Sequence, residues 1–225
     1  MEIEIKHFKF KHPFTCLIAG PTGSGKTFLL RRILKHHNKL ISNVTSPIKV
    51  LWAYGQWQSL YSVPISSNVI VNYHDGLPSQ ASIQEFNPEI IILDDLMNQF
   101  DKNKDLENLF IKQSHHLNIS VIFAVQNLFY KTVRTISLNT QYLILMKSPR
   151  DAQQILNLAR QIFPNNPKFL TEAYNDATKQ AYGYIKIDLT PDTPEQFRVQ
   201  TRFTPEEVEH LNKEFAPIVY KPKNV

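Results

Sequence analysis

Short apolar runs alternate along the chain with segments whose apolar residues recur at helical spacing. Helical spacing predicts helices over Phe28–His37, Asp105–Ser114 and Asp151–Phe163. Strands that are apolar throughout and alternate with helices indicate a parallel sheet covered on both faces, and hence an α/β fold. The apolar runs predicted as strands are Phe14–Ala19, Ile48–Tyr54, Val69–Tyr73, Glu89–Leu93, Ser120–Val125 and Tyr142–Met146.

The pattern changes near the end of the chain. Tyr182–Leu189 and Phe197–Phe203 alternate apolar with polar residues, and the turn-forming segment Thr190–Gln196 joins them. This pattern predicts an antiparallel hairpin at the edge of the sheet. The sequence Thr-Pro-Glu-Glu from Thr204 is typical of a helix start, and we expect that helix to reach about Phe215.

The last residues, Val219–Val225, have no periodicity and are expected to form a loose tail. No Gly- or Ser-rich linker divides the chain. We therefore predict one domain over residues 1–215, followed by a tail over residues 216–225, which suits a length of 225 residues.

Composition excludes several classes of protein. The hydrophobic fraction is 42%, enough for a buried core. No apolar run approaches the roughly 18 residues that cross a bilayer, and the first residues lack the apolar stretch of a signal peptide. Cys16 is the single cysteine, so no internal disulfide can form. We expect neither a secreted protein nor a membrane span.

The net charge of +5 is unevenly distributed. Residues 1–40 contain eight basic and two acidic residues, and residues 111–170 contain seven basic residues and one acid. Concentrated basic surface attracts polyanions, namely nucleic acid, nucleotide phosphates or anionic lipid. Two solvated faces would give the same count, so charge alone leaves both interpretations open.

One segment matches the phosphate-loop pattern G-x-x-x-x-G-K-[ST] at every fixed position, between a predicted strand and a predicted helix. Glycines allow the backbone N–H groups to turn inward around phosphate oxygens, and the helix directs its positive dipole end at the same anion. The lysine would contact the β- and γ-phosphates, and the threonine hydroxyl would ligate Mg²⁺. The predicted nucleotide-binding residues are Gly20, Pro21, Thr22, Gly23, Ser24, Gly25, Lys26 and Thr27.

Two carboxylates follow the strand over Glu89–Leu93. Strands of an open parallel sheet deliver such groups at their carboxyl ends, where ligands bind. Asp94 would hold the Mg²⁺ hydration shell, and Asp95 would act as general base toward the attacking water. A helix cap or turn is the alternative interpretation of the pair. Many ATPases that have this pair carry Glu at its second position. Asp is one methylene shorter, which changes the distance from the carboxylate to the attacking water.

A polar amide follows the strand over Ser120–Val125. At that strand end an amide can sense the γ-phosphate or orient water. Gln126 directly follows the apolar run and is the preferred candidate, with Asn127 as the alternate.

The motifs GPTGSGKT, IIILDD and SVIFAVQN, in this order, resemble the HerA/FtsK superfamily of ring-forming DNA-pumping ATPases. The segments RTISLN, KSPRD and LARQ, within residues 134–161, are similar to virus-encoded genome-packaging ATPases of the poxvirus and Maverick/Polinton/adintovirus type. Tyr182-Gly183-Tyr184 with the Thr-Pro-rich turn resembles the closing hairpin of that group. The resemblance covers roughly residues 10–205.

The resemblance implies a P-loop NTPase fold with strand order 5-1-4-3-2 and antiparallel additions. It implies ATP and Mg²⁺ as cofactors, and double-stranded DNA, further copies of the chain in a ring, and viral capsid or portal proteins as partners. Each ATP site would be completed by an arginine from the neighbouring subunit, with Arg150 and Arg134 as the candidates. The implied location is the infected host cell or the virion.

Two other functions remain open on the sequence. A small-molecule kinase would use the same loop but needs an acceptor pocket. A non-hydrolysing, nucleotide-gated adaptor would bind ATP without turnover, and the Asp at position 95 is the best argument for it. No LSGGQ-like run is present, which disfavours an ABC-type ATPase.

Several residue groups have plainer interpretations. The pairs His36–His37 and His115–His116 are expected on the surface, because they lack Cys or acidic partners at ligand spacing. Three aromatic residues could stack on bases or lie along DNA, but duplex bases are already stacked, so we expect packing in a core or interface; they are Trp52, Trp57 and Tyr61. Four lysines could contact DNA phosphates, namely Lys102, Lys104, Lys112 and Lys131.

Overall fold

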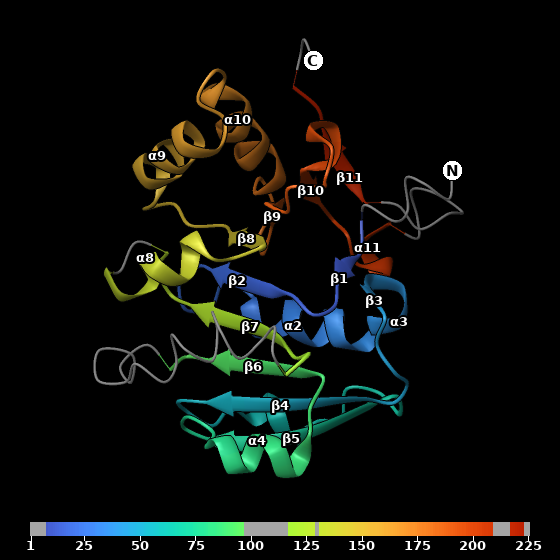
Figure 1. Ribbon diagram of the computed structural model, residues 1–225. Coiled ribbons are helices and arrows are strands. Elements are labelled where there is room, and N and C mark those ends of the chain that lie inside the picture. The colour runs from blue at the N-terminus through green and yellow to red at the C-terminus, as the bar shows by residue number, and fades with distance from the viewer. Residues whose placement is uncertain (1–7, 97–116, 129–130, 209–216, 223–225) are drawn as a thin grey trace.

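The computed structural model describes residues 8–96, 117–128, 131–208 and 217–222 (Figure 1). Its main feature is a nine-stranded sheet with the order β11-β10-β9-β8-β2-β7-β6-β4-β5. The strands of its parallel part are β2 (Thr15–Ala19), β4 (Ile48–Tyr54), β5 (Val69–Asp75), β6 (Ile90–Asp94), β7 (Ser120–Val125) and β8 (Tyr142–Met146). A separate parallel pair joins β1 (Phe10–Lys11) to β3 (Ile41–Ser42).

The central five strands run β8-β2-β7-β6-β4, which confirms the predicted order 5-1-4-3-2. Neighbours within this set are parallel, as in the pairing of Leu17 on β2 with Phe123 on β7. Strand β5 extends the sheet beyond β4, also in parallel. All carboxyl ends therefore lie at one edge of the sheet, which positions the loops that follow β2, β6 and β7 close together.

The C-terminal strands are antiparallel, as predicted. Strand β9 (Tyr184–Asp188) pairs with β8 and with β10 (Val199–Thr201), and the 3₁₀ helix η3 (Glu195–Phe197) precedes β10. Strand β11 (Ile218–Tyr220) then pairs with β10. The loose tail expected over Val219–Val225 is therefore wrong in its first residues, and β11, not the hairpin, forms the sheet edge. Backbone pairing with an open strand edge orders these residues, although their sequence has no periodicity.

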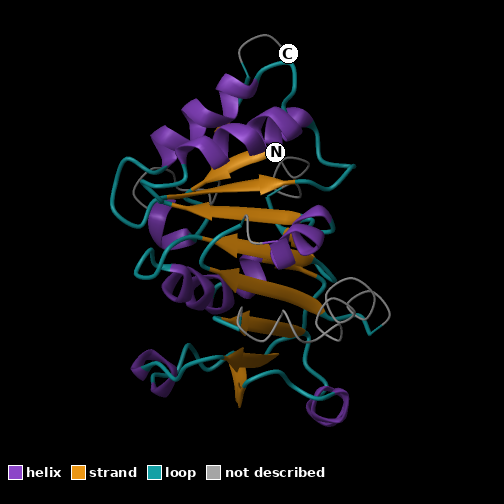
Figure 2. Cartoon of the chain, turned by 90° about the vertical axis from the view of Figure 1, so that its left-hand side faces the viewer, coloured by secondary structure: helices purple, strands orange, loops and turns teal. Residues whose placement is uncertain are grey.

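Helices cover both faces of the sheet (Figure 2). Alternate strand residues point to opposite faces, so Leu17 packs in one core cluster and Ile18 in the other. Residues of α2 (Lys26–Lys35) and α3 (His37–Leu40) contribute to the cluster that contains Ile18. The opposite cluster receives residues of α4 (Gln80–Phe86), α8 (Lys131–Leu138), α9 (Ala152–Ile162) and α10 (Pro167–Ala177).

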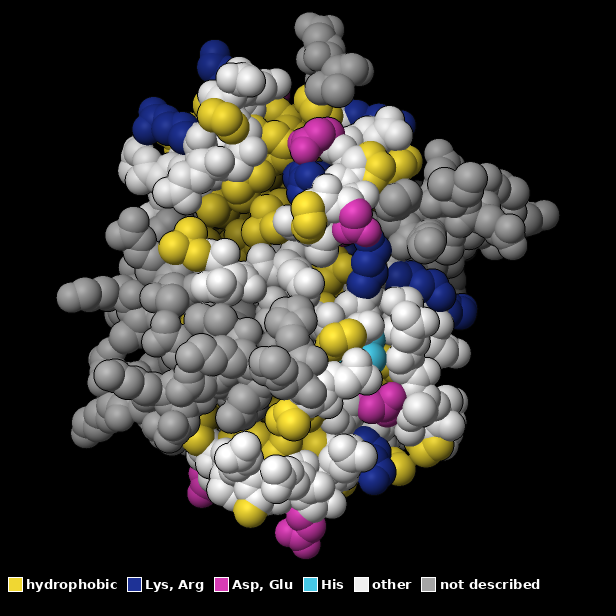
Figure 3. Space-filling view, viewed as in Figure 1, with side chains coloured by type: hydrophobic (Ala, Val, Ile, Leu, Met, Phe, Trp, Pro, Cys, Tyr) yellow, Lys and Arg dark blue, Asp and Glu magenta, His cyan; other side chains and the backbone are white. Residues whose placement is uncertain are grey.

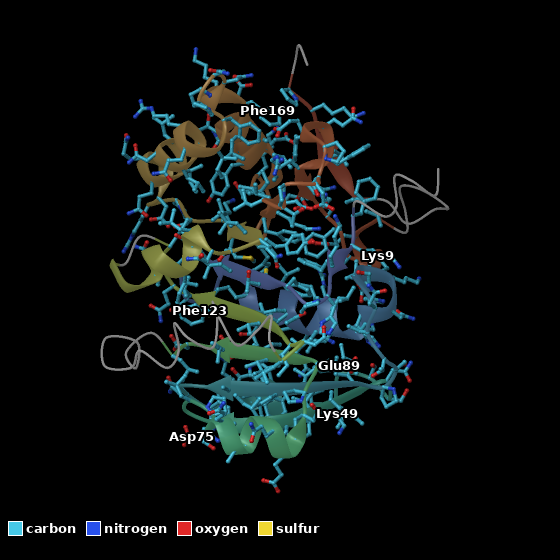
Figure 4. The ribbon with its side chains drawn as sticks, in the orientation of Figure 1. Lys9, Lys49, Asp75, Glu89, Phe123 and Phe169 are labelled. Carbon is cyan, nitrogen blue, oxygen red and sulfur yellow. The ribbon has the colours of Figure 1, made fainter. Side chains whose placement is uncertain are left out.

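Charged side chains mark the two ends of the parallel strands. Glu89 and Lys49 lie near each other at the amino ends of β6 and β4, whereas Asp75 ends β5 at the opposite edge (Figure 4). The Glu89 carboxylate accepts hydrogen bonds from Thr45 N at 2.7 Å and from Lys49 N at 3.3 Å. These contacts are local to the amino edge, whereas the loop after β2 and Asp94 at the end of β6 lie at the carboxyl edge.

Lys186 on β9 is fully buried, although alternation along the strand predicts a polar face. Its Nζ donates to Phe8 O at 3.0 Å and to Gln200 Oε1 at 3.2 Å, and lies 4.4 Å from the centre of the Phe10 ring. Burial lowers the pKa of Lys186 to about 8. The N-terminal segment therefore covers this part of the sheet, and Lys186 fixes it there.

Some expectations are corrected or fall outside the described residues. His37 is buried, with its Nδ1 2.9 Å from Leu34 O, so the expectation of a surface position is wrong for it. The helix predicted over Asp105–Ser114 and the pair His115–His116 lie outside the described residues, as do Lys102, Lys104 and Lys112, and the Lys131 side chain. Helix α11 (Pro205–Val208) begins where predicted.

Within the described ranges, no helix has both the length and the apolar character needed to cross a bilayer.

Candidate functional site

The phosphate loop connects β2 to α2 at the carboxyl edge of the sheet, as its sequence context predicts. Gly23 and Gly25 have φ values of 78° and 98°, which side chains other than glycine rarely adopt. Gly25 is also the N-cap of α2, whose first turn has no acidic residue. Free backbone N–H groups and the positive end of the helix dipole therefore face the loop, which suits it to an anion.

Lys26 is the first residue of α2 and lies at the loop. Its Nζ donates to Gly20 O at 2.6 Å and to Pro21 O at 3.1 Å. Burial lowers the pKa of Lys26, while the nearby Asp94 and Asp95 raise it. A partly desolvated ammonium group of this kind interacts more strongly with an incoming charge than one in bulk water.

Asp94 ends β6 and is 2% exposed. Its Oδ2 accepts hydrogen bonds from the Tyr61 hydroxyl at 2.9 Å and from Thr27 Oγ1 at 3.3 Å. Burial raises the pKa of the Asp94 carboxyl, and the hydrogen bond from Tyr61 is the largest opposing effect. The two residues predicted to hold Mg²⁺, Thr27 and Asp94, are thus in direct contact.

Asp95 is exposed at the start of the following loop and has a φ of 56°, a left-handed conformation that is uncommon outside glycine. Gln126 Nε2 donates to Asp95 Oδ1 at 3.0 Å, so the amide that follows β7 contacts the second carboxylate. A Cβ at Gly55 would come within 2.1 Å of Asp95 O. Glycine at position 55 therefore permits the backbone path that places Asp95 beside Gln126.

These groups line one cavity of about 1110 Å³. It contains most of the predicted site residues, namely Thr22, Gly23, Gly25, Lys26, Thr27, Asp94, Asp95 and Gln126. Gly20, Pro21 and Ser24 belong to the same loop but are not among the lining residues. Asn127, the alternate to Gln126, is half-buried and does not line the cavity.

Arg150, one of the two candidate arginines, does not line this cavity. Arg150 is exposed in the loop between β8 and α9. Arg134 belongs to α8, and its side chain lies outside the described residues.

Tyr61 is a site residue that the sequence did not identify. It lies in the 3₁₀ helix η1 (Ser59–Ser62), in the connection between β4 and β5. Arg31 on α2 holds this connection, because its guanidinium donates to Leu60 O at 3.0 Å and to Val63 O at 2.7 Å. Aromatic residues in this connection are a visible signal, but no sequence pattern indicates which ring reaches Asp94.

The oxygen atoms at Thr27 and Asp94 are of the kind that Mg²⁺ prefers. Within the described ranges, no group of three or more His, Cys, Asp and Glu side chains is placed to hold a metal ion. A Mg²⁺ ion at Thr27 and Asp94 would therefore take its remaining ligands from phosphates and water, which is its usual coordination in nucleotide sites.

Comparison with known proteins gives structural matches only. No protein-family model and no curated protein matches the chain. The DNA-packaging ATPase B204 from Sulfolobus turreted icosahedral virus is 14% identical, with a TM-score of 0.51 over 96% of this chain and 100% of that chain. The genome-packaging NTPase B204 from Sulfolobus turreted icosahedral virus 2, in complex with sulfate, is 13% identical, with a TM-score of 0.50 over 93% and 97%. Likeness at this identity establishes a shared fold, that of the P-loop NTPases.

Proposed function

We propose that this chain is an ATP-hydrolysing motor that moves double-stranded DNA and packages a viral genome into a capsid. The main support is the meeting of Lys26, Asp94 and the Asp95–Gln126 pair in one cavity at the phosphate loop. The fold shared with the DNA-packaging ATPase B204 is consistent with it. The segments within residues 134–161 suggest the poxvirus and Maverick/Polinton type within the HerA/FtsK superfamily.

The proposed mechanism gives each side chain a separate task. The loop N–H groups and Lys26 bind the nucleotide phosphates, and Lys26 balances the charge that builds up as the γ-phosphoryl group departs. Asp95 accepts the proton of the attacking water, and the hydrogen bond from Gln126 orients its carboxylate. Thr27 and Asp94 would hold Mg²⁺, which when bound neutralises phosphate charge.

The proposed DNA contact is consistent with the net charge of +5, which two solvated basic faces would give equally. On the face in Figure 3, Lys and Arg side chains lie along the side of β1 and α3 and also over α9 and α10, and Asp and Glu side chains lie between them. Capsid and portal contacts, and a location in the infected cell or the virion, follow only from the proposed packaging role.

The test is ATP turnover measured with and without linear duplex DNA, together with the native mass of the assembly. We expect DNA to stimulate turnover of a ring. Equal rates with and without DNA would contradict the translocase. Turnover that needs an added acceptor molecule would instead indicate a kinase, and binding without turnover would indicate the adaptor.

A mixing experiment tests the proposed role of Arg150 at the subunit interface. We expect Arg150→Ala subunits to depress the activity of wild-type subunits in a shared ring more than in proportion to their fraction. An arginine that acts in trans contributes about 10³- to 10⁵-fold to turnover, so each mixed interface is nearly inactive, and in a ring whose sites hydrolyse ATP in sequence one such interface stalls the others. Arg160→Ala is the matched control, because Arg160 is also exposed but lies within α9. Activity proportional to the wild-type fraction would refute an Arg150 whose loss at one interface stalls the whole ring.

Tyr61→Phe should weaken the use of Mg²⁺ without unfolding the protein. The substitution keeps the ring in its aromatic cluster but removes the hydrogen bond to Asp94 Oδ2. Partners that orient a metal-binding carboxylate contribute about 10- to 100-fold to metal affinity or activity. We expect the Mg²⁺ concentration for half-maximal hydrolysis to rise about tenfold or more.

The control for this prediction is Tyr54→Phe. The Tyr54 ring packs against Tyr61 with centroids 5.6 Å apart, so this variant alters the same cluster. Equal Mg²⁺ dependence in the two variants would argue against a specific role for the Tyr61 hydroxyl.

A further inference from the structure

The cavity extends well beyond the phosphate loop, and exposed hydrophobic side chains concentrate along it. Among the described residues, the large hydrophobic side chains that are exposed are Phe28, Trp57, Val63, Ile70, Leu117, Leu138 and Tyr182. Those that line the cavity are Phe28, Trp57, Val63 and Tyr182. Apolar surface next to a phosphate site suits the part of a ligand that carries no charge.

Tyr182 is the most unusual of these residues, because its backbone φ is 61°. Left-handed conformations are rare for an aromatic residue and persist only where the surroundings enforce them. Lys147 supplies that constraint, since its N donates to Gly183 O at 2.9 Å and its Nζ donates to Lys179 O at 2.9 Å. Gly183 has no room for a side chain, because a Cβ there would lie 2.4 Å from Ala177 O.

This constrained turn between α10 and β9 places the Tyr182 ring beside the phosphate loop. A Cβ at Gly25 would lie 3.1 Å from Tyr182 Cδ1, so the ring is in contact range of the first residues of α2. Tyr182 is nevertheless 67% exposed. The turn therefore holds a tyrosine ring at the cavity wall without burying it, which core packing does not require.

We propose that Tyr182 is the platform on which the base of a bound nucleoside triphosphate stacks. This inference rests on the proposed nucleotide-dependent function. A nucleobase is a flat ring with apolar faces, and an exposed aromatic side chain binds such a face by stacking. The phosphate loop would then bind the charged part of the ligand, and Tyr182 would bind the base. Stacking is tolerant of the base, so Tyr182 would bind adenine and guanine nucleotides alike.

The test compares ADP with inorganic tripolyphosphate, which carries phosphates but no base. Tyr182→Gly removes the ring and fits a φ of 61° without strain, so the turn should persist. We expect the affinity for ADP to fall by on the order of 5- to 100-fold, the range for one base–aromatic stack. The affinity for GDP should fall by a similar factor, and that for tripolyphosphate should stay within about twofold of wild type. Tyr182→Phe should restore ADP binding.

Other outcomes separate this inference from the proposed function. Equal loss of ADP and tripolyphosphate would mean that Tyr182 supports the loop through Gly25, and would overturn the stacking role. Unchanged ADP affinity in Tyr182→Gly would also overturn the stacking role. So would a loss of ADP affinity that appears in Phe28→Ala but not in Tyr182→Gly. If the wild-type protein binds ADP through Tyr182 but hydrolyses ATP at the same rate with and without DNA, only the proposed motor function is refuted. If wild-type protein binds neither probe, both proposals fail.

Discussion

Lys26→Ala is expected to reduce ATP hydrolysis by about 100-fold or more, and to weaken nucleotide binding as well. The ammonium group is the one cationic side chain of the phosphate loop, and it lies within hydrogen-bond distance of the loop carbonyls of Gly20 and Pro21. Removing one preorganised group that stabilises transition-state charge typically costs about 10²- to 10³-fold in rate. The measurement is phosphate release at saturating ATP, with ADP affinity measured alongside.

The matched control for this prediction is Lys39→Ala. Lys39 is an exposed lysine on α3, so the variant loses the same charge away from the cavity. It should keep wild-type turnover. If Lys26→Ala protein melts at the wild-type temperature and still hydrolyses ATP at the wild-type rate, the cavity at the phosphate loop is not the site of hydrolysis.

The sequence predicts the parallel core of this fold well because its inner strands β2, β6, β7 and β8 are buried on both faces. Largely apolar runs such as Ile48–Tyr54, Ser120–Val125 and Tyr142–Met146 can form few other structures, and their observed bounds agree with the predicted ones. The positions of the phosphate loop, the acid pair and Gln126 can be predicted for the same reason. Each of them lies at the carboxyl end of such a strand, and parallel pairing brings those ends to one edge.

Features that depend on contacts between distant segments could not be predicted. The alternation in β9 suggests that Lys186 points to solvent, but the segment around Phe8 and Phe10 covers it. Residues 218–220 are strand-forming in type but too few to show a period, and they pair with β10 because its edge is available. Tyr61 and Asp94 are 33 residues apart along the chain. They meet because β4 and β6 are neighbours in the sheet.

Asp95→Asn is the second substitution with a large expected effect. The amide is nearly isosteric with the carboxylate, and its oxygen can still accept the hydrogen bond from Gln126 Nε2. It cannot take a proton from water, so a general base at this position predicts a loss of turnover of about 10²- to 10⁴-fold with little change in ADP affinity. Single-turnover hydrolysis together with an ADP titration measures both quantities.

Gly55→Ala tests the same role through the backbone, without altering any polar group. Its Cβ would meet Asp95 O at 2.1 Å, a distance that forces the chain at Asp95 to move away. Displacement by about 1 Å is enough to cost a positioned group on the order of 100-fold in rate. We therefore expect Gly55→Ala to lower turnover while Lys26 and the phosphate loop still bind ADP. If Gly55→Ala lowers turnover but Asp95→Asn does not, the loop after β6 matters for its shape, and Asp95 is not the base. If neither does, hydrolysis does not depend on Asp95 at all, and another group must activate the water.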